Sequence, residues 1–277
     1  MKKIDVADIE LKPEDRSEVL RYLGYSGQII EEPLEKDIEA AIQAVNDSAE
    51  PRILYKIYDI AEDGDFKDDL HFLEGDDIRR HLSGCNKVLL MAATIGMKTD
   101  LMIRQAAIRN PIQSIIMDSA GSTLIEVVCD TVEAELREEV EAEGQYLTSR
   151  FSPGYGDLPL HAQKGFFDAL EIRRIGIHLS EDDLMTPRKS VTAVLGIADH
   201  PVKKKERSCN SCNLRECCRF RARGNVCGEQ AHGRAPEEMS AESRRMAGQQ
   251  RKCLWRTGAW PGSMRRMNDD NAGRLLI

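Results

Sequence analysis

The sequence lacks the features that place a chain in a membrane or in the secretory pathway. No stretch of the 277 residues approaches the roughly 20 consecutive apolar residues of a membrane-spanning helix. The first residues, MKKIDVADIELKPEDR, turn acidic at once and contain no apolar core, so they do not have the pattern of a signal peptide. We therefore expect a cytoplasmic protein that has no membrane partner.

Positive charge is scarce over most of the chain. The net charge is −8, but residues 231–277 carry nine Lys or Arg against five Asp or Glu, so residues 1–230 stand at −12. Nucleic acids attract basic surfaces, and this distribution therefore argues against a general nucleic-acid-binding protein. The basic run of Lys203, Lys204, Lys205 and Arg207 is interpreted as a solvated linker.

The apolar pattern predicts an α+β fold. The segment 87–96 is almost continuously apolar, which is typical of a strand buried on both faces. The segment 112–143 has an apolar stripe at helical spacing, with most glutamates off that stripe. Irregular alternation of strands and helices favours a mixed, largely antiparallel twisted sheet flanked by helices. The other predicted helices span 14–23, 34–46, 75–82 and 160–170, and the other predicted strands span 53–60, 173–179 and 190–197.

Composition also predicts the domain organisation. Residues 1–200 are expected to form the main domain, and residues 201–230 a cysteine-rich extension with a metal or iron–sulfur motif. Residues 231–277 are rich in Gly, Arg, Met and Ala and follow no apolar period. We expect this tail to be disordered.

The loop Arg150-Phe-Ser-Pro-Gly-Tyr155 has the composition of a ligand-binding turn. A Pro-Gly pair favours a tight turn, and glycine lets a ligand approach the backbone closely. The guanidinium of Arg150 suits bidentate binding of a carboxylate, and Tyr155 offers a ring face and a hydroxyl. The residues alone leave two interpretations open: a binding site for an amino acid attached to a planar group, or a structural loop after a long helix.

The pattern Arg-x-x-x-Gly-Tyr resembles the signature of the reactivation domain of cobalamin-dependent methionine synthase. The matching positions are Arg150, Ser152, Gly154 and Tyr155, with a small residue at the place of Ser152. The resemblance extends over about residues 19–200, and its motifs occur in the expected order. They are VLRYLGYSGQ at 19–28, AATIG at 92–96, DSAGSTLIEVVCD at 118–130 and IGIHLSEDDLMTPRKSVTAVLGI at 175–197.

The resemblance implies a function in methionine biosynthesis or a similar pathway. A protein of this family binds S-adenosylmethionine at the loop and positions its methyl group over the cobalt of an inactive cob(II)alamin, which an electron donor reduces by one electron. No general base is required, in keeping with the lack of a convincing catalytic triad. An acidic residue contacts the amino group of the ligand in this family, and Asp130 and Glu126 are the two candidates here.

The cobalamin itself is expected on a partner protein. The segment Asp69-Leu-His71-Phe-Leu-Glu-Gly75 comes near the Asp-x-His-x-x-Gly loop whose histidine ligates cobalt, but its glycine stands one position too late. We interpret this segment as a surface turn. The expected partner is a corrinoid-binding methyltransferase, such as a methionine synthase without its own activation domain.

A cysteine cluster forms a second candidate site. Cys209 and Cys212 form a C-x-x-C pair, Cys217 follows, and Cys227 supplies a possible fourth ligand, with Cys218 as a rival to Cys217. Four thiolates at such spacing can hold zinc or an iron–sulfur cluster, and free redox thiols are the alternative. The cluster also supports a different function: an electron-transfer or interaction protein without S-adenosylmethionine chemistry.

Overall fold

The structure is a computed structural model that describes residues 6–25, 28–61 and 70–202. All of them belong to one unit of the chain, Met1–Glu206. The predictions for the cysteine cluster and for the tail after residue 230 fall outside the described residues.

A four-stranded antiparallel sheet is the centre of this unit. Its order is β1-β2-β6-β3, and every neighbouring pair is antiparallel, as the sequence predicted. In β2 every residue from Val88 to Thr94 is buried, which confirms the expected strand with two covered faces. A separate hairpin pairs β4 with β5. The strands are β1 (Arg52–Asp59), β2 (Lys87–Thr94), β3 (Tyr146–Leu147), β4 (His178–Leu179), β5 (Met185–Thr186) and β6 (Ser190–Ala198).

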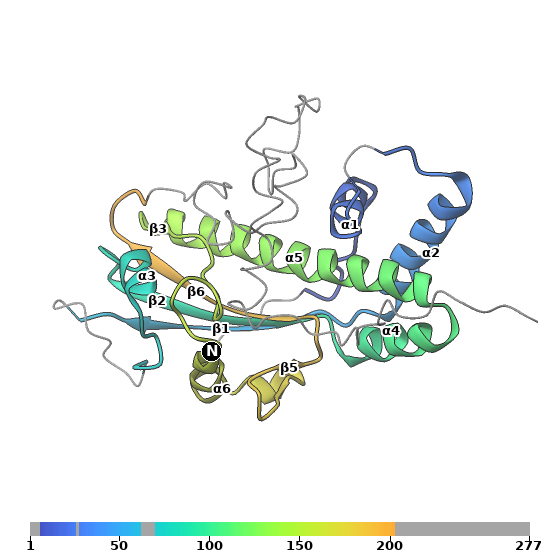
Figure 1. Cartoon of the computed structure of the whole chain (residues 1–277). Coiled ribbons are helices and arrows are strands. Elements are labelled where there is room, and N and C mark those ends of the chain that lie inside the picture. The colour runs from blue at the N-terminus through green and yellow to red at the C-terminus, as the bar shows by residue number, and fades with distance from the viewer. Residues whose placement is uncertain (1–5, 26–27, 62–69, 203–277) are drawn as a thin grey trace, which may run out of the picture. The chain divides into compact units, whose positions relative to one another are not determined.

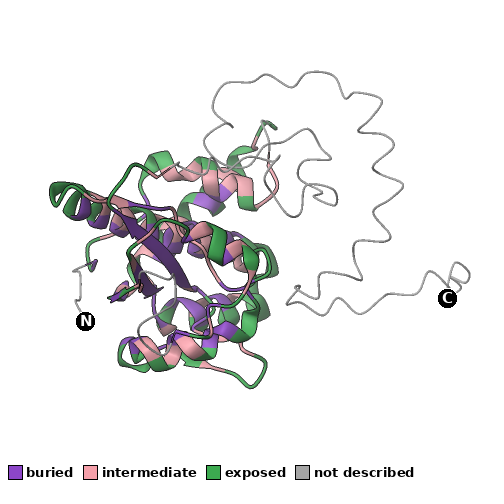
Figure 2. Cartoon of the chain, turned by 90° about the vertical axis from the view of Figure 1, so that its left-hand side faces the viewer, coloured by how far each residue is buried: buried purple, intermediate pink, exposed green. Residues whose placement is uncertain are grey.

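Helices cover both faces of the sheet (Figure 1). Alternate residues of β2 serve the two faces: Leu89 packs with Leu124 of α5, and Leu90 packs with Phe166 of α6. The buried residues therefore concentrate on the sheet and on the inward sides of the helices (Figure 2). The helices are α1 (Arg16–Tyr22), α2 (Glu32–Ser48), α3 (Asp76–His81), α4 (Met97–Arg109), α5 (Pro111–Ala142) and α6 (Gln163–Leu170), with 3-10 turns η1 (Pro13–Asp15), η2 (Leu160–Ala162) and η3 (Ile172–Ile175).

The long helix α5 packs lengthwise on the sheet and is contacted by α1, α2 and α4. It begins where Asn110 caps it, because the Asn110 side chain accepts a hydrogen bond from the Gln113 backbone N–H at 3.3 Å. It is the one described helix long and apolar enough to span a membrane, judged by length and composition only. Half of its most apolar window is buried inside the fold, and core helices of soluble proteins share this property.

Two predictions at the level of secondary structure need correction. The expected strand over 173–179 was wrong: Ile172 and Ile175 form a 3-10 turn that buries both side chains, and only His178–Leu179 pair as a strand. The sequence analysis also missed α4. Only Thr99, Asp100 and Ile103 of this helix are buried, so it has no apolar stripe that a periodicity search can detect.

Candidate functional site

The loop after Arg150 forms a tight turn, as its composition predicted. Pro153 and Gly154 occupy the two central positions, Gly154 has φ +90°, and the Tyr155 backbone N–H donates to the Ser152 carbonyl at 3.1 Å. Proline second and glycine third, with positive φ at the glycine, is the arrangement of a type II turn. A side chain at position 154 would meet only Leu160, at 4.0 Å, so the space above this glycine is open.

Both ends of the loop are attached to the core. Phe151 and Val194 of β6 exchange two backbone hydrogen bonds of 2.9 and 2.8 Å. At the other end, the Asp157 carboxylate accepts hydrogen bonds from the backbone N–H groups of Asp76 and Asp77, at 2.6 and 3.0 Å, and so caps α3. The turn is therefore held in place independently of any ligand.

Arg150 lies against α5 with its side chain only 5% exposed. Its Nη2 donates to Glu126 Oε2 at 3.1 Å and to Asp130 Oδ1 at 2.6 Å. Its Nη1 is 3.3 Å from Glu133 Oε2 but has no hydrogen-bond partner of good geometry among the described residues. A buried guanidinium nitrogen with an unused donor is the feature that a carboxylate ligand would satisfy.

The local charges keep Arg150 cationic. Burial acts to lower the pKa of its guanidinium, but the neighbouring Cys129, Asp130 and Glu126 raise it further, and the net direction is upward. Cys129, just below, stays a neutral thiol because burial raises its pKa to about 12. Arg150 thus faces three carboxylates. Arg137 also pairs with Glu133, at 2.8 Å, so the cluster has a surplus of one negative charge.

The sequence had proposed Asp130 and Glu126 as alternatives for the acidic contact, and the structure brings both to Arg150. It adds Glu133, which the sequence analysis did not select for the site. Positions 126, 130 and 133 are spaced by four and three residues, so they share one face of α5. That spacing is a signal in the sequence, but it becomes specific only once Arg150 is known to pack there.

The remaining residues of the loop have different surroundings. Tyr155 is 67% exposed and lies at the end of the turn, while Ser152 is half-buried and supplies the carbonyl that closes it. Their proposed contacts with a ligand stay predictions. In the segment 70–75, His71 is exposed and starts a turn, as expected for a surface position.

The described residues contain no group of three or more His, Cys, Asp or Glu side chains that could hold a metal ion. Cys85 and Cys129 are free thiols within this part of the chain. The candidate ligands Cys209, Cys212, Cys217 and Cys227 all lie outside the described residues. The metal site therefore stays a prediction from the sequence.

Residues 75–204, which include the loop, most of the sheet and α5, match the family described as vitamin B12 dependent methionine synthase, activation domain. This part of the chain is therefore similar to that activation domain. Among solved structures it is similar to the MetH reactivation domain bound to AdoHcy, with a TM-score of 0.51, 16% identity, and coverage of 73% of this chain and 79% of that chain. At this identity the structural similarity concerns the fold. A search of curated proteins finds no match.

The family match and the geometry concern the same part of the chain. Arg150, its three carboxylates and the Pro-Gly turn all lie within residues 75–204. Helix α1 lies outside the matched segment, although it packs directly on α5.

Proposed function

We propose that the protein binds S-adenosylmethionine at Arg150 and supports the reductive methylation of cob(II)alamin on a separate corrinoid-dependent methyltransferase. The observation that carries the proposal is the buried Arg150 with its unused Nη1 donor, located in a segment that matches the activation-domain family. The solved reactivation domain of similar fold is bound to AdoHcy, which is the demethylated form of the proposed ligand.

The residues around Arg150 suit the amino-acid end of S-adenosylmethionine. Its carboxylate is the natural partner of a guanidinium, and its ammonium is the natural partner of Glu126 or Asp130. Both of these carboxylates are accessible, with side chains 41% and 61% exposed. The loop turn next to Arg150 offers Gly154, where the backbone can be approached closely.

In this function the chain contributes position rather than acid–base chemistry. S-adenosylmethionine supplies the methyl group, and one electron from a donor completes the conversion of cob(II)alamin to methylcobalamin. The anchored turn and Arg150 hold the ligand in one orientation, and the exposed Tyr155 lies at the surface where a corrin face would approach. An orientation fixed before the partner arrives lowers the entropic cost of the transfer.

Two measurements test the proposal. Titration calorimetry of the full chain with S-adenosylmethionine should show saturable binding. The protein should also accelerate the return of methylcobalamin when it is mixed with a corrinoid partner trapped as cob(II)alamin, S-adenosylmethionine and a reductant, as followed in the visible spectrum of cobalt. Tyr155→Ala should slow this recovery more than Tyr155→Phe. The proposal would be refuted if the wild-type chain failed to accelerate recovery with every corrinoid partner from the same cell.

A second candidate function rests on the Cys209, Cys212, Cys217 and Cys227 pattern: an electron-transfer or interaction protein. It predicts bound zinc or an iron–sulfur cluster without any affinity for S-adenosylmethionine. The calorimetric titration separates the two functions, because only the first requires Arg150 to bind a ligand.

A further inference from the structure

The three carboxylates at Arg150 differ in how firmly they are held. Glu133 is 16% exposed and also binds Arg137 at 2.8 Å, so it is fixed between two cations. Glu126 and Asp130 are more exposed, and both contact the same nitrogen, Nη2 of Arg150. A ligand carboxylate that takes Nη2 and the unused Nη1 would therefore release Glu126 and Asp130 while leaving Glu133 in place.

S-adenosylmethionine carries two positive groups, an ammonium and a sulfonium, for its single carboxylate. Two released carboxylates match two ligand cations. We infer that Asp130 pairs with the ammonium, while Glu126 and the ring of Tyr22 face the sulfonium, so that the site prefers S-adenosylmethionine to S-adenosylhomocysteine. This inference rests on the proposed function and adds to it a basis for telling substrate from product.

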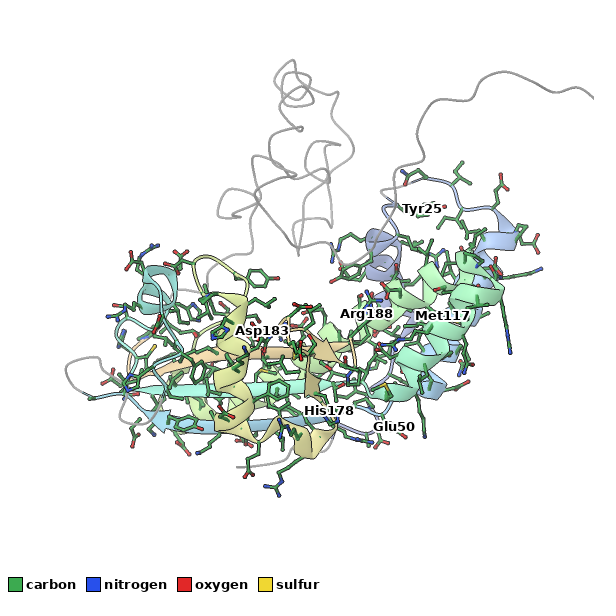
Figure 3. All side chains as sticks on the ribbon, turned by 60° about the horizontal axis from the view of Figure 1, so that its bottom comes forward. Tyr25, Glu50, Met117, His178, Asp183 and Arg188 are labelled. Carbon is green, nitrogen blue, oxygen red and sulfur yellow. The ribbon has the colours of Figure 1, made fainter. Side chains whose placement is uncertain are left out.

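Tyr22 enters the inference because α1 carries it to α5. It is the last residue of that helix, which packs on α5, and it is 43% exposed. Figure 3 labels Tyr25, just beyond α1, and Met117 on α5, which locate this part of the fold. The packing of α1 on α5 brings Tyr22 toward the helix that carries Glu126. In keeping with this, the pKa of the Tyr22 hydroxyl is raised, first by burial and next by the negative charge of Glu126. An aromatic face and a carboxylate both attract a cation.

The Tyr22 ring already accepts one cation. The guanidinium of Arg21 lies 4.4 Å from the ring centroid, and Arg21 is itself neutralised by Glu18 at 2.6 Å. One face of the ring is thereby covered and its orientation fixed. Since the side chain remains partly exposed, it can offer a preset surface to a sulfonium group beside Glu126.

The preference has a consequence for turnover. Methyl transfer converts the sulfonium into a neutral thioether, so the ligand changes from net +1 to net zero while the site keeps its surplus of negative charge. The product should then be held less tightly than the substrate. Release of the product would follow from the chemistry itself, without a separate conformational change.

The test compares the affinities of the full chain for S-adenosylmethionine and S-adenosylhomocysteine by titration calorimetry. The wild-type chain should prefer S-adenosylmethionine by about tenfold or more. Glu126→Gln keeps the shape but removes the charge, and it should lower the affinity for S-adenosylmethionine by about tenfold while changing that for S-adenosylhomocysteine by less than about twofold. Asp130→Asn is the matched control and should weaken both ligands alike, because both carry the ammonium.

Tyr22 provides an independent arm. Tyr22→Phe should retain the preference, and Tyr22→Leu should lose several-fold of the affinity for S-adenosylmethionine only. Sinefungin, in which a carbon bearing an amino group replaces the methylated sulfur, should follow S-adenosylmethionine in every variant. Equal wild-type affinity for the two ligands, or a Glu126→Gln variant that weakens both equally, would overturn the inference and leave the proposed function standing. A wild-type chain that binds neither ligand would remove both.

Discussion

Removal of Arg150 separates its role in ligand binding from its role in the fold. Arg150→Met keeps much of the aliphatic contact with α5 and deletes the guanidinium. Loss of a buried, charge-assisted bidentate contact should weaken S-adenosylmethionine binding by about 2–4 kcal/mol, which is roughly 30- to 900-fold. The sequence placed Arg150 on a loop, but its side chain is 5% exposed, so some loss of stability is also expected.

The size of that stability loss follows from the exposure of the three partners. Glu126 and Asp130 are 41% and 61% exposed and regain water when the guanidinium is removed. Glu133 is the shielded one, at 16% exposed, and it keeps its contact with Arg137. The free energy of unfolding should therefore fall by only about 1–2 kcal/mol, which is less than for a fully buried ion pair.

Arg137→Met is the matched control. Arg137 binds the same Glu133, and it also donates to the Leu147 and Thr148 carbonyls at 2.5 and 3.4 Å, so its contacts serve the fold. Urea denaturation should show that this variant loses at least as much stability as Arg150→Met. Calorimetry should show that its affinity for S-adenosylmethionine is within about threefold of wild type. Equal losses of affinity in the two variants would show that Arg150 acts through stability alone, and the assignment of the site would fail.

Three further predictions concern other parts of the chain. Burial lowers the pKa of Lys189, although Asp118 at 2.9 Å opposes this, so the folded chain releases this proton at lower pH than the unfolded chain. The free energy of unfolding of the wild type, relative to that of Lys189→Met, should therefore rise with pH just below 10.5, by at most about 1.4 kcal/mol per pH unit. Urea titrations at several pH values measure this difference, and a difference that does not change with pH would contradict the prediction. In α6, Gly165→Ala should lower the free energy of unfolding by about 1–3 kcal/mol despite the better helix propensity of alanine, because the added Cβ would lie 2.0 Å from the Phe72 ring. Adding Phe72→Leu to the same chain should recover part of this loss in thermal unfolding. A Gly165→Ala variant that is more stable than wild type would refute the packing. Anaerobically purified protein should contain zinc, or iron with labile sulfide, at about one site per chain. Cys209→Ser should lose the bound metal, whereas Cys85→Ser should retain it. A metal-free wild type would leave only the redox-thiol interpretation.

Much of the secondary structure could be predicted because apolar periodicity reports burial directly. Strand β2 and helix α5 have long, consistent patterns, and both were predicted within a few residues of their observed bounds. Helix α4 was missed because it packs on α5 through few residues, two of them the polar Thr99 and Asp100. The expected strand at 173–179 failed because Ile172 and Ile175, three positions apart, bury the same side of a 3-10 turn over α6. In a strand, residues at this spacing would face opposite sides.

The sequence by itself determined the turn and the family. Proline followed by glycine restricts the backbone locally, so the conformation at Pro153 and Gly154 needs no distant partner. The ordered series of motifs was likewise enough to indicate the activation-domain family, which the match over residues 75–204 bears out.

Only the tertiary structure decided what faces Arg150. Its carboxylate partners lie 17 to 24 positions earlier in the chain, and nothing in that separation specifies contact. The pairing of Phe151 with Val194 fixes the start of the loop, where Arg150 meets α5, and that pairing depends on the whole sheet. Local sequence thus sets the shape of the turn, because backbone preferences act over a few residues. The charge of the site comes from α5, because packing brings distant residues together.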